Sequence, residues 1–122
     1  LFMDFGSIIT SNDTELGNNV YIGAFSQLDS VNLGHDALIA PNVFISGKKN
    51  RHGTNRKKIM RLQEGDVTKI NIEDDVWAGA GSNIFSDVSK GTVIGTASYV
   101  NKKFEEYSIL GGVPAKVIGK RS

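Results

Sequence analysis

From Ile70 to Ile84 the sequence reads INIEDDVWAGAGSNI, and its aliphatic residues return at a fixed interval. Ile72, Ala78 and Ile84 lie six positions apart, and a small or β-branched residue stands two positions before each of them. An α-helix repeats about every 3.6 residues and a half-buried strand alternates every two, so neither explains a period of six. Short extended segments that end in tight corners do match it.

The same period runs through most of the chain. The aliphatic positions are Leu16, Ile22, Leu28, Leu33, Ile39, Ile45, Ile72, Ala78, Ile84, Ile94 and Val100. Glycine often follows them, as at Gly23 and Gly79, which predicts corners there. One residue is missing between Leu28 and Leu33, and the repeat is shortened around 86–92. We therefore predict an all-β protein, a single-stranded parallel β-helix whose coils stack their aliphatic residues. A β-sandwich is the competing interpretation, but its strands would need longer alternating runs.

The repeat is interrupted by GKKNRHGTNRKK at 47–58. Between Lys48 and Lys69 there are eight Lys and Arg residues, opposed only by Glu64 and Asp66. We expect a single domain over 1–122, with an extruded loop at about 47–69 and a tail at about 103–122. Two interpretations of the basic loop remain open. It is either a solvated excursion or a segment that covers a neighbouring subunit's cleft and receives an anionic group.

Composition excludes several classes of protein. The chain has 122 residues, with Lys+Arg 14 against Asp+Glu 13, so net charge predicts neither a nucleic acid nor a membrane partner. Without cysteine there are no disulfides, thiolate metal sites or cysteine nucleophiles. No segment is apolar enough for a membrane span, and LFMDFG at the start lacks the features of a signal peptide. We expect a cytoplasmic protein.

Three segments resemble the hexapeptide-repeat acyltransferases. IEDDVWAGAGSNI (72–84), TVIGTASYVNK (92–102) and YSILGGVPAKVIGKR (107–121) are similar to successive coils and the closing segment of that family. LGHDALIAPNVFIS (33–46), followed by an insertion that bears a histidine, most resembles the branch of galactoside, maltose and xenobiotic acetyltransferases. The resemblance covers the chain from about Leu16 onward. It implies a left-handed β-helix, acetyl-CoA as co-substrate, and a homotrimer with active sites between subunits.

His52 occupies the position of the family's catalytic histidine, at the start of the loop. Histidine suits a general base near neutral pH. The alternative is a solvated loop histidine. No G-x-S-x-G motif or cysteine offers a nucleophile, which favours direct acyl transfer over an acyl-enzyme. His35 is expected to be a corner side chain, and two histidines cannot supply a three-histidine zinc site, so no metal is expected.

The resemblance also implies positions that bind coenzyme A. These are Trp77, Gly79, Ala80, Thr96, Asn101, Lys102, Lys116 and Lys120, with Arg121 an alternative to Lys120 for a phosphate. A purely structural role at a coil corner is the competing explanation for Gly79, Ala80 and Thr96. Solubility is the competing explanation for Lys116 and Lys120. Asp29 is a weak candidate for an acceptor contact, and Ala24 stands where galactoside-type relatives present an asparagine.

We therefore expect an acetyl-CoA-dependent O-acetyltransferase that acts on a hydroxyl of a sugar or saccharide, with His52 as base. One alternative is an N-acetyltransferase for an amino sugar, or a xenobiotic acetyltransferase, using the same site. Another is a non-catalytic trimeric β-helix that serves as a scaffold.

Overall fold

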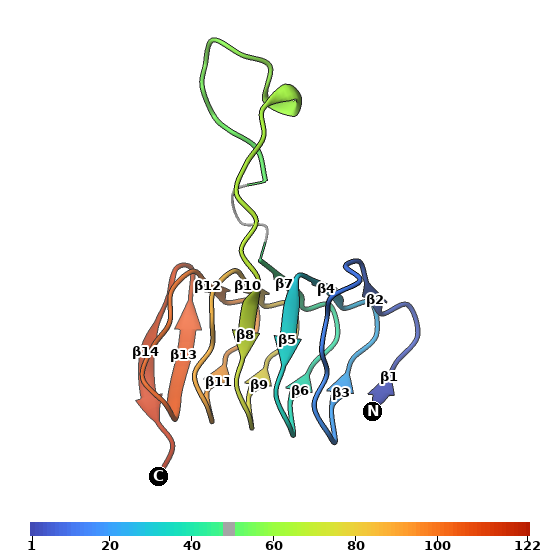
Figure 1. Cartoon of the computed structure of the whole chain (residues 1–122). Helices are drawn as coiled ribbons and strands as arrows, with labels where there is room; N and C mark the ends of the chain where they lie inside the picture. The colour runs from blue at the N-terminus through green and yellow to red at the C-terminus, as the bar shows by residue number, and fades with distance from the viewer. Residues whose placement is uncertain (48–50) are drawn as a thin grey trace.

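The computed structural model describes residues 1–47 and 51–122, which form a stack of β-helical coils with one projecting loop (Figure 1). Each coil contributes short strands to the faces of the stack. The first face contains β1 (Phe2–Met3), β3 (Tyr21–Ile22), β6 (Leu38–Ile39), β9 (Trp77–Ala78), β11 (Val93–Ile94), β13 (Ser108–Gly112) and β14 (Ala115–Lys120). The second face contains β2 (Ile8–Ile9), β4 (Gln27–Asp29), β7 (Phe44–Ser46), β10 (Asn83–Ile84) and β12 (Tyr99–Val100). The third face contains β5 (Val31–Leu33) and β8 (Ile70–Ile72).

Parallel pairing joins each coil to the next. Leu38 of β6 pairs with Tyr21 of β3 on one side and with Trp77 of β9 on the other, and the same register continues along the first face. Only β14 breaks this rule among the described strands, because it folds back antiparallel on β13 and closes the stack. The tail predicted at about 103–122 thus contains a β-hairpin, formed by β13 and β14.

The aliphatic positions of the repeat line the interior, which confirms the predicted parallel β-helix. Ile22, Leu28, Ile39, Ile45 and Ile84 are at most 1% exposed. The small residues two positions earlier are also buried, and where they are serines, as at Ser26 and Ser82, the hydroxyl donates to a backbone carbonyl at the corner. Ser26 Oγ donates to the Ala40 carbonyl and Ser82 Oγ to the Gly79 carbonyl, at 2.9 and 2.8 Å. Buried hydroxyls therefore cost little here, since each has an acceptor.

All irregularities of the repeat fall at one corner, where the chain passes from the second face to the third. Steps of six residues separate buried positions at the other two corners. At this corner the step is five from Leu28 to Leu33 and four from Ile84 to Val88, and the loop lies between Ile45 and Ile72. Val88, which the sequence period did not identify, bridges to Ile72 and completes the third face. Variable length at a single corner leaves the stacking of the other two unchanged.

The N-terminal segment forms an additional coil, which the resemblance from Leu16 onward did not predict. Phe2–Met3 pairs with β3, and Ile8–Ile9 pairs with β4. Met3 and Ile9 pack against the core and are separated by the same six residues. The six-residue spacing of Met3 and Ile9 was present in the sequence, but two positions alone are too few to identify a repeat.

Corner geometry differs from the simple expectation for glycine. Most left-handed residues lie three positions before a buried aliphatic residue of the repeat, and several of them are Asn or Asp, as at Asn19 and Asp36. Gly23, which follows an aliphatic residue, does not have a positive φ. A Cβ there would lie 2.5 Å from the backbone nitrogen of Pro41 on the next coil. That glycine is needed for close stacking of coils rather than for turning.

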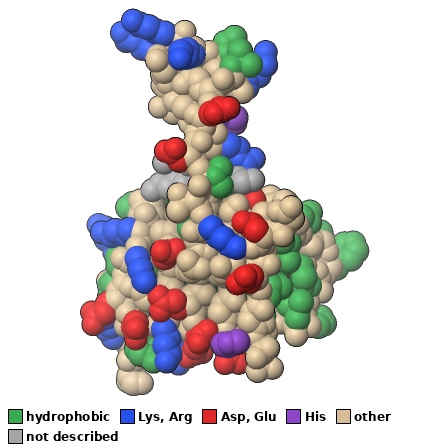
Figure 2. All heavy atoms as spheres, viewed as in Figure 1, with side chains coloured by type: hydrophobic (Ala, Val, Ile, Leu, Met, Phe, Trp, Pro, Cys, Tyr) green, Lys and Arg blue, Asp and Glu red, His purple; other side chains and the backbone are tan. Residues whose placement is uncertain are grey.

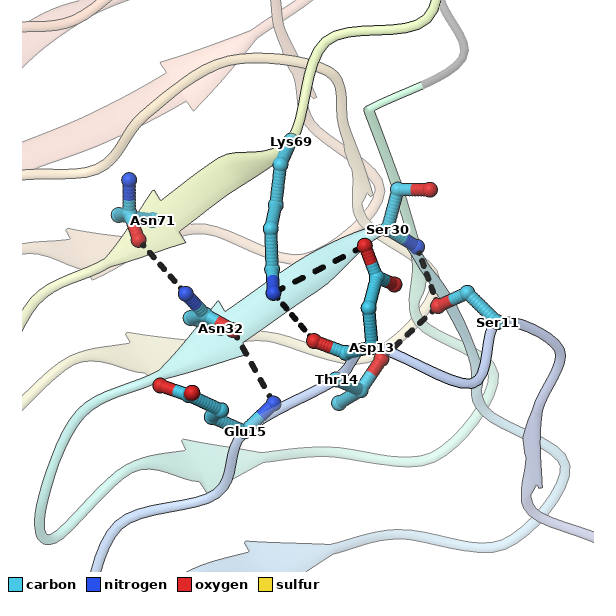
Figure 3. A network of polar contacts seen from close by, with 8 residues as sticks. All are labelled: Ser11, Asp13, Thr14, Glu15, Ser30, Asn32, Lys69 and Asn71. Atoms are coloured by element: carbon cyan, nitrogen blue, oxygen red, sulfur yellow. Dashed lines mark hydrogen bonds and ion pairs between the residues drawn. The ribbon is translucent and has the colours of Figure 1, made fainter.

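The outer surfaces of the faces differ in polarity. On the third face Asn32 donates to Asn71 at 3.1 Å and accepts from the backbone of Glu15 (Figure 3). Lys69 lies where the loop returns to the coils. Its Nζ atom is 3.8 Å from the Asp13 carboxylate and also donates to the backbone carbonyl of Asp13. The first face instead presents a ladder of apolar side chains in register. They are Phe2, Tyr21, Leu38, Trp77, Val93 and Ile109.

Candidate active site

His52 lies on the projecting loop, which leaves the stack after β7 and returns at β8. Its Nδ1 atom is 3.2 Å from the backbone carbonyl oxygen of Gln63. A carbonyl can only accept, so Nδ1 carries the proton in this contact, and in the neutral imidazole Nε2 is then the nitrogen with the free lone pair. The side chain is exposed. This arrangement leaves an imidazole nitrogen able to take a proton from a bound molecule.

The cavity beside His52 has a volume of about 540 Å³. Two guanidinium groups, those of Arg51 and Arg61, line it together with Glu64. Lys and Arg side chains also gather at the tip of the loop, with hydrophobic side chains between them (Figure 2). The tip includes the 3₁₀ turn Met60–Leu62, and Met60 and Leu62 are both more than 60% exposed. Lys48 and Lys49 of the basic segment lie outside the described residues.

Asp29 ends β4 beneath the loop. Its side chain is 2% exposed, and one carboxylate oxygen lies 3.0 Å from the guanidinium of Arg51. The carboxylate therefore faces the residue next to His52 rather than open surface. An acceptor contact by Asp29 stays a prediction, while its ion pair with Arg51 is a feature that sequence reasoning missed.

Four of the positions expected to bind coenzyme A lie close together. Trp77 is 54% exposed on the first face. Gly79 and Ala80 follow it at the corner between the first and second faces, and the backbone N–H of Ala97 donates to the Ala80 carbonyl at 2.9 Å. Thr96 is thus on the coil directly above, exposed at the same corner. A Cβ on Gly79 would lie 2.6 Å from the Ile94 carbonyl oxygen, so close packing alone already requires glycine there.

The remaining candidates lie toward the last coil and are partly engaged within the chain. Lys102 sits 5.3 Å from the centre of the Phe104 ring, and Asn101 precedes it just after β12. Lys120 forms an ion pair with Glu105 at 3.0 Å. Lys116 is exposed on β14.

Arg121 is also engaged in an ion pair. Its guanidinium lies 2.9 Å from the Asp75 carboxylate and 5.8 Å from the centre of the Tyr107 ring. Exposed pairs of this kind are weak. A phosphate could replace either carboxylate at small cost, so these residues stay candidates for a phosphate contact.

One chain does not bring His52 and Trp77 together. The loop leaves from the corner between the second and third faces, whereas Trp77 lies on the first face. Trp77 lines a separate cavity of about 330 Å³ with Leu38, Asp75 and Arg121. Among the described residues, this cavity shares no lining residue with the one beside His52.

The described residues offer neither a metal site nor a membrane-spanning helix. Residues 1–47 and 51–122 contain no group of three or more His, Cys, Asp or Glu side chains placed to hold a metal ion. The described part of the chain also contains no helix with the length and apolar character of a membrane span.

Comparison with known proteins places the fold. No family model matches the chain. It is 30% identical over 127 residues to a putative lipopolysaccharide biosynthesis O-acetyl transferase, WbbJ, of Escherichia coli K12, covering 94% of this chain and 61% of the relative. A solved galactoside acetyltransferase in complex with coenzyme A superposes with a TM-score of 0.79 at 28% identity, over 89% of this chain and 56% of that one. The chain is similar in sequence and fold to members of the hexapeptide-repeat acyltransferase family. Its coils are the left-handed β-helix of that family.

A further relative matches about half of the chain at higher identity. A chloramphenicol acetyltransferase of Agrobacterium fabrum is 46% identical over 62 residues, which is 49% of this chain and 28% of the relative. The chain spans less than two thirds of the length of each of these relatives. The galactoside and xenobiotic branches named from the sequence are thus both represented among them.

Proposed function

We propose that this protein is an acetyl-CoA-dependent O-acetyltransferase acting on a sugar hydroxyl, with His52 as general base. The observation that carries the proposal is the contact between His52 Nδ1 and the Gln63 carbonyl, because it directs the basic Nε2 atom away from the loop backbone. Relatives named for lipopolysaccharide and galactoside acetylation support a saccharide acceptor. Since acetyl-CoA is made and used in the cytoplasm, we place the reaction there.

The proposed reaction is a direct transfer within a ternary complex. His52 Nε2 removes the proton from the acceptor hydroxyl as its oxygen attacks the thioester carbonyl carbon. The tetrahedral intermediate then collapses, the carbon–sulfur bond breaks, and the proton on His52 passes to the departing thiolate. The products are an acetyl ester and free coenzyme A, and no covalent bond to the protein forms.

Coenzyme A is assigned to the corner formed by Gly79, Ala80 and Thr96. Small residues on adjacent coils let an extended pantetheine arm approach backbone groups. Trp77 is the first residue of β9, the strand that leads into this corner, and it offers an exposed aromatic surface. Lys102, Lys116 and Lys120 are the cations proposed for the phosphates, together with Asn101 beside them.

The proposed assembly is a homotrimer. The apolar ladder on the first face includes Phe2, Leu38 and Trp77, each more than half exposed in the single chain. A continuous apolar surface of this kind is typical of an interface. Another copy of the chain is the favoured partner, because the His52 and Trp77 cavities can then meet between subunits. Light scattering should give a trimer for the wild type and smaller species for Leu38→Glu.

Release of coenzyme A thiol tests the activity. Acetyl-CoA is incubated with p-nitrophenyl galactoside, neutral monosaccharides, a nucleotide-linked amino sugar and chloramphenicol, and products are identified by mass spectrometry. A hydroxylamine-labile ester on a saccharide is the expected product. A stable amide would instead establish N-acetylation, and failure to bind acetyl-CoA in calorimetry would favour the scaffold.

A xenobiotic acceptor is the second candidate function. The match to a chloramphenicol acetyltransferase favours it, because it reaches 46% identity, although it is confined to about half of the chain. Chloramphenicol presents a hydroxyl, so the same base would serve. A specificity constant for chloramphenicol above that of every saccharide in the panel would select this function over saccharide acetylation.

A further inference from the structure

The side chain of Gln63 crosses the projecting loop and binds the backbone of the segment on its other side. Its Oε1 atom accepts from the backbone N–H of Asn55 at 3.1 Å. Its Nε2 atom donates to the carbonyl oxygens of Asn55 and Lys58, at 3.0 and 3.1 Å. One side chain therefore satisfies three backbone groups across the loop, as a strand would in a sheet.

The backbone of the same residue holds His52. The Gln63 carbonyl oxygen is the group that faces His52 Nδ1. Gly53 lies between them in the chain, and a Cβ there would lie 2.6 Å from Gln63 Oε1. The glycine leaves the space that the glutamine side chain occupies. Contacts of Gln63 thus join the beginning of the segment from His52 to Gln63 to its end.

A second attachment fixes the other side of His52. Arg51 is ion-paired at 3.0 Å with Asp29, whose side chain is almost fully buried at the end of β4. His52 follows Arg51 directly, so its backbone is tied to the rigid coils on one side and to Gln63 on the other. Irregular backbone that is attached in this way loses much of the freedom expected of an exposed loop.

We infer that Gln63 is a positioning residue for His52, whose side-chain clamp across the loop aims its own carbonyl at Nδ1 and so keeps Nε2 as the proton acceptor. This inference rests on the proposed function for its catalytic consequence. Its structural part is independent of it. The glutamine amide is the only neutral side chain long enough to donate two hydrogen bonds and accept one here. Without the clamp, the carbonyl would move and either ring nitrogen could carry the proton.

His35 supplies an internal reference for the test. Its Nδ1 atom accepts from the backbone N–H of Asn18 at 2.8 Å, so its proton is on Nε2. The chain has only two histidines, and they should therefore show opposite tautomers. Long-range ¹H–¹⁵N spectra of labelled protein, recorded in alkaline solution where neutral imidazole prevails, report which nitrogen is protonated. Histidine-to-asparagine variants assign the two rings.

Three variants separate the possible roles. Gln63→Ala removes the clamp. Gln63→Glu keeps the size of the side chain but replaces the amide nitrogen, which donates to two carbonyls, with a carboxylate oxygen that cannot donate. Thr54→Ala is the matched control, since this exposed loop residue makes no side-chain hydrogen bond among the described residues. Turnover is measured with acetyl-CoA and the panel acceptor that releases thiol fastest.

We expect both Gln63 variants to lose the Nδ1-protonated tautomer of His52 while His35 is unchanged. Turnover number should fall about 10–100-fold, with the Michaelis constant for acetyl-CoA changed less than about 2-fold. Thr54→Ala should resemble the wild type in both measurements. Retention of the tautomer in Gln63→Glu would overturn the inference, since a space-filling role would then suffice.

Loss of the tautomer with unchanged turnover would also overturn it. Failure of the proposed function gives a different result, because His52→Ala would then be as active as the wild type while the tautomer measurements stand unchanged.

Discussion

The two histidines lie in regions that position side chains in different ways. His35 stands at a corner of the coil stack, where its backbone N–H donates to Asp74 at 2.7 Å and its ring accepts from Asn18. Both partners belong to adjacent coils at equivalent corners. His52 is held by Gln63, eleven residues away in an irregular loop. The coils place a side chain through a repeated register, whereas the loop relies on a few particular side chains. Substitutions should therefore have different consequences in the two regions.

The largest difference is expected between His52→Ala and His35→Ala. Removing the proposed base should lower turnover about 10²–10⁴-fold. Removing His35 leaves a backbone N–H of Asn18 to be solvated at an exposed corner, so turnover should stay within about 2-fold. Thiol release from acetyl-CoA measures both, and circular dichroism and light scattering check the fold and assembly. Equal losses in the two variants would remove the distinction between the two regions.

Stability should show the reverse pattern. Ile39 is fully buried in the coil stack, and Ile39→Ala is expected to lower the free energy of unfolding by about 2–5 kcal/mol. Leu62 is 66% exposed at the loop tip, so Leu62→Ala should change stability by less than about 0.5 kcal/mol in the isolated chain. Denaturant titration at a concentration that favours monomers gives both values. A costly Leu62→Ala would mean that the loop tip packs against something within the chain.

The contrast also explains what the sequence could and could not predict. A period of six residues identifies Ile22, Ile39 and Ile84 as interior positions, because each coil repeats the same packing problem. Val88 escaped because the step before it is four residues long, at the one corner where coil length varies. Period alone carries no information at that corner.

The candidate site, which stays a prediction, could be read from the sequence only in part. His52 could be named from the resemblance, because the family frame fixes where the loop begins. Its contact with Gln63 could not, since no periodicity relates two residues of an irregular loop. The ion pair between Arg51 and Asp29 was hidden for the same reason. The proposed meeting of the His52 and Trp77 cavities would need a second chain, and the only sign of one in the sequence is the apolar outer surface of the first face.

Glycines in the two regions should respond differently to the same change. At Gly23 an added Cβ meets backbone atoms of Ala40 and Pro41, which the stack holds in place. Gly23→Ala should therefore cost about 1–3 kcal/mol of stability. At Gly53 the added Cβ meets the Gln63 side chain, which can move. Gly53→Ala should leave the unfolding free energy within about 0.5 kcal/mol and lower turnover, because it displaces the clamp. Unchanged turnover would argue against that clamp.

The smallest effect concerns the exposed ion pair between Glu73 and Lys103. A hydrogen bond from Lys103, at 2.9 Å, lowers the pKa of Glu73, with a further contribution from the backbone N–H of Lys90. A carboxyl with a lowered folded pKa stabilises the protein above its unfolded pKa and loses that effect as the pH falls through the folded one. Both side chains are more than a third exposed, so solvent screens most of the interaction. Glu73→Gln should therefore lower the melting temperature by about 2 °C at most near pH 7, and by less as the solution is acidified below about pH 4. If the difference in melting temperature between the wild type and Glu73→Gln grew on acidification, the ion pair would not be the source of the stabilisation.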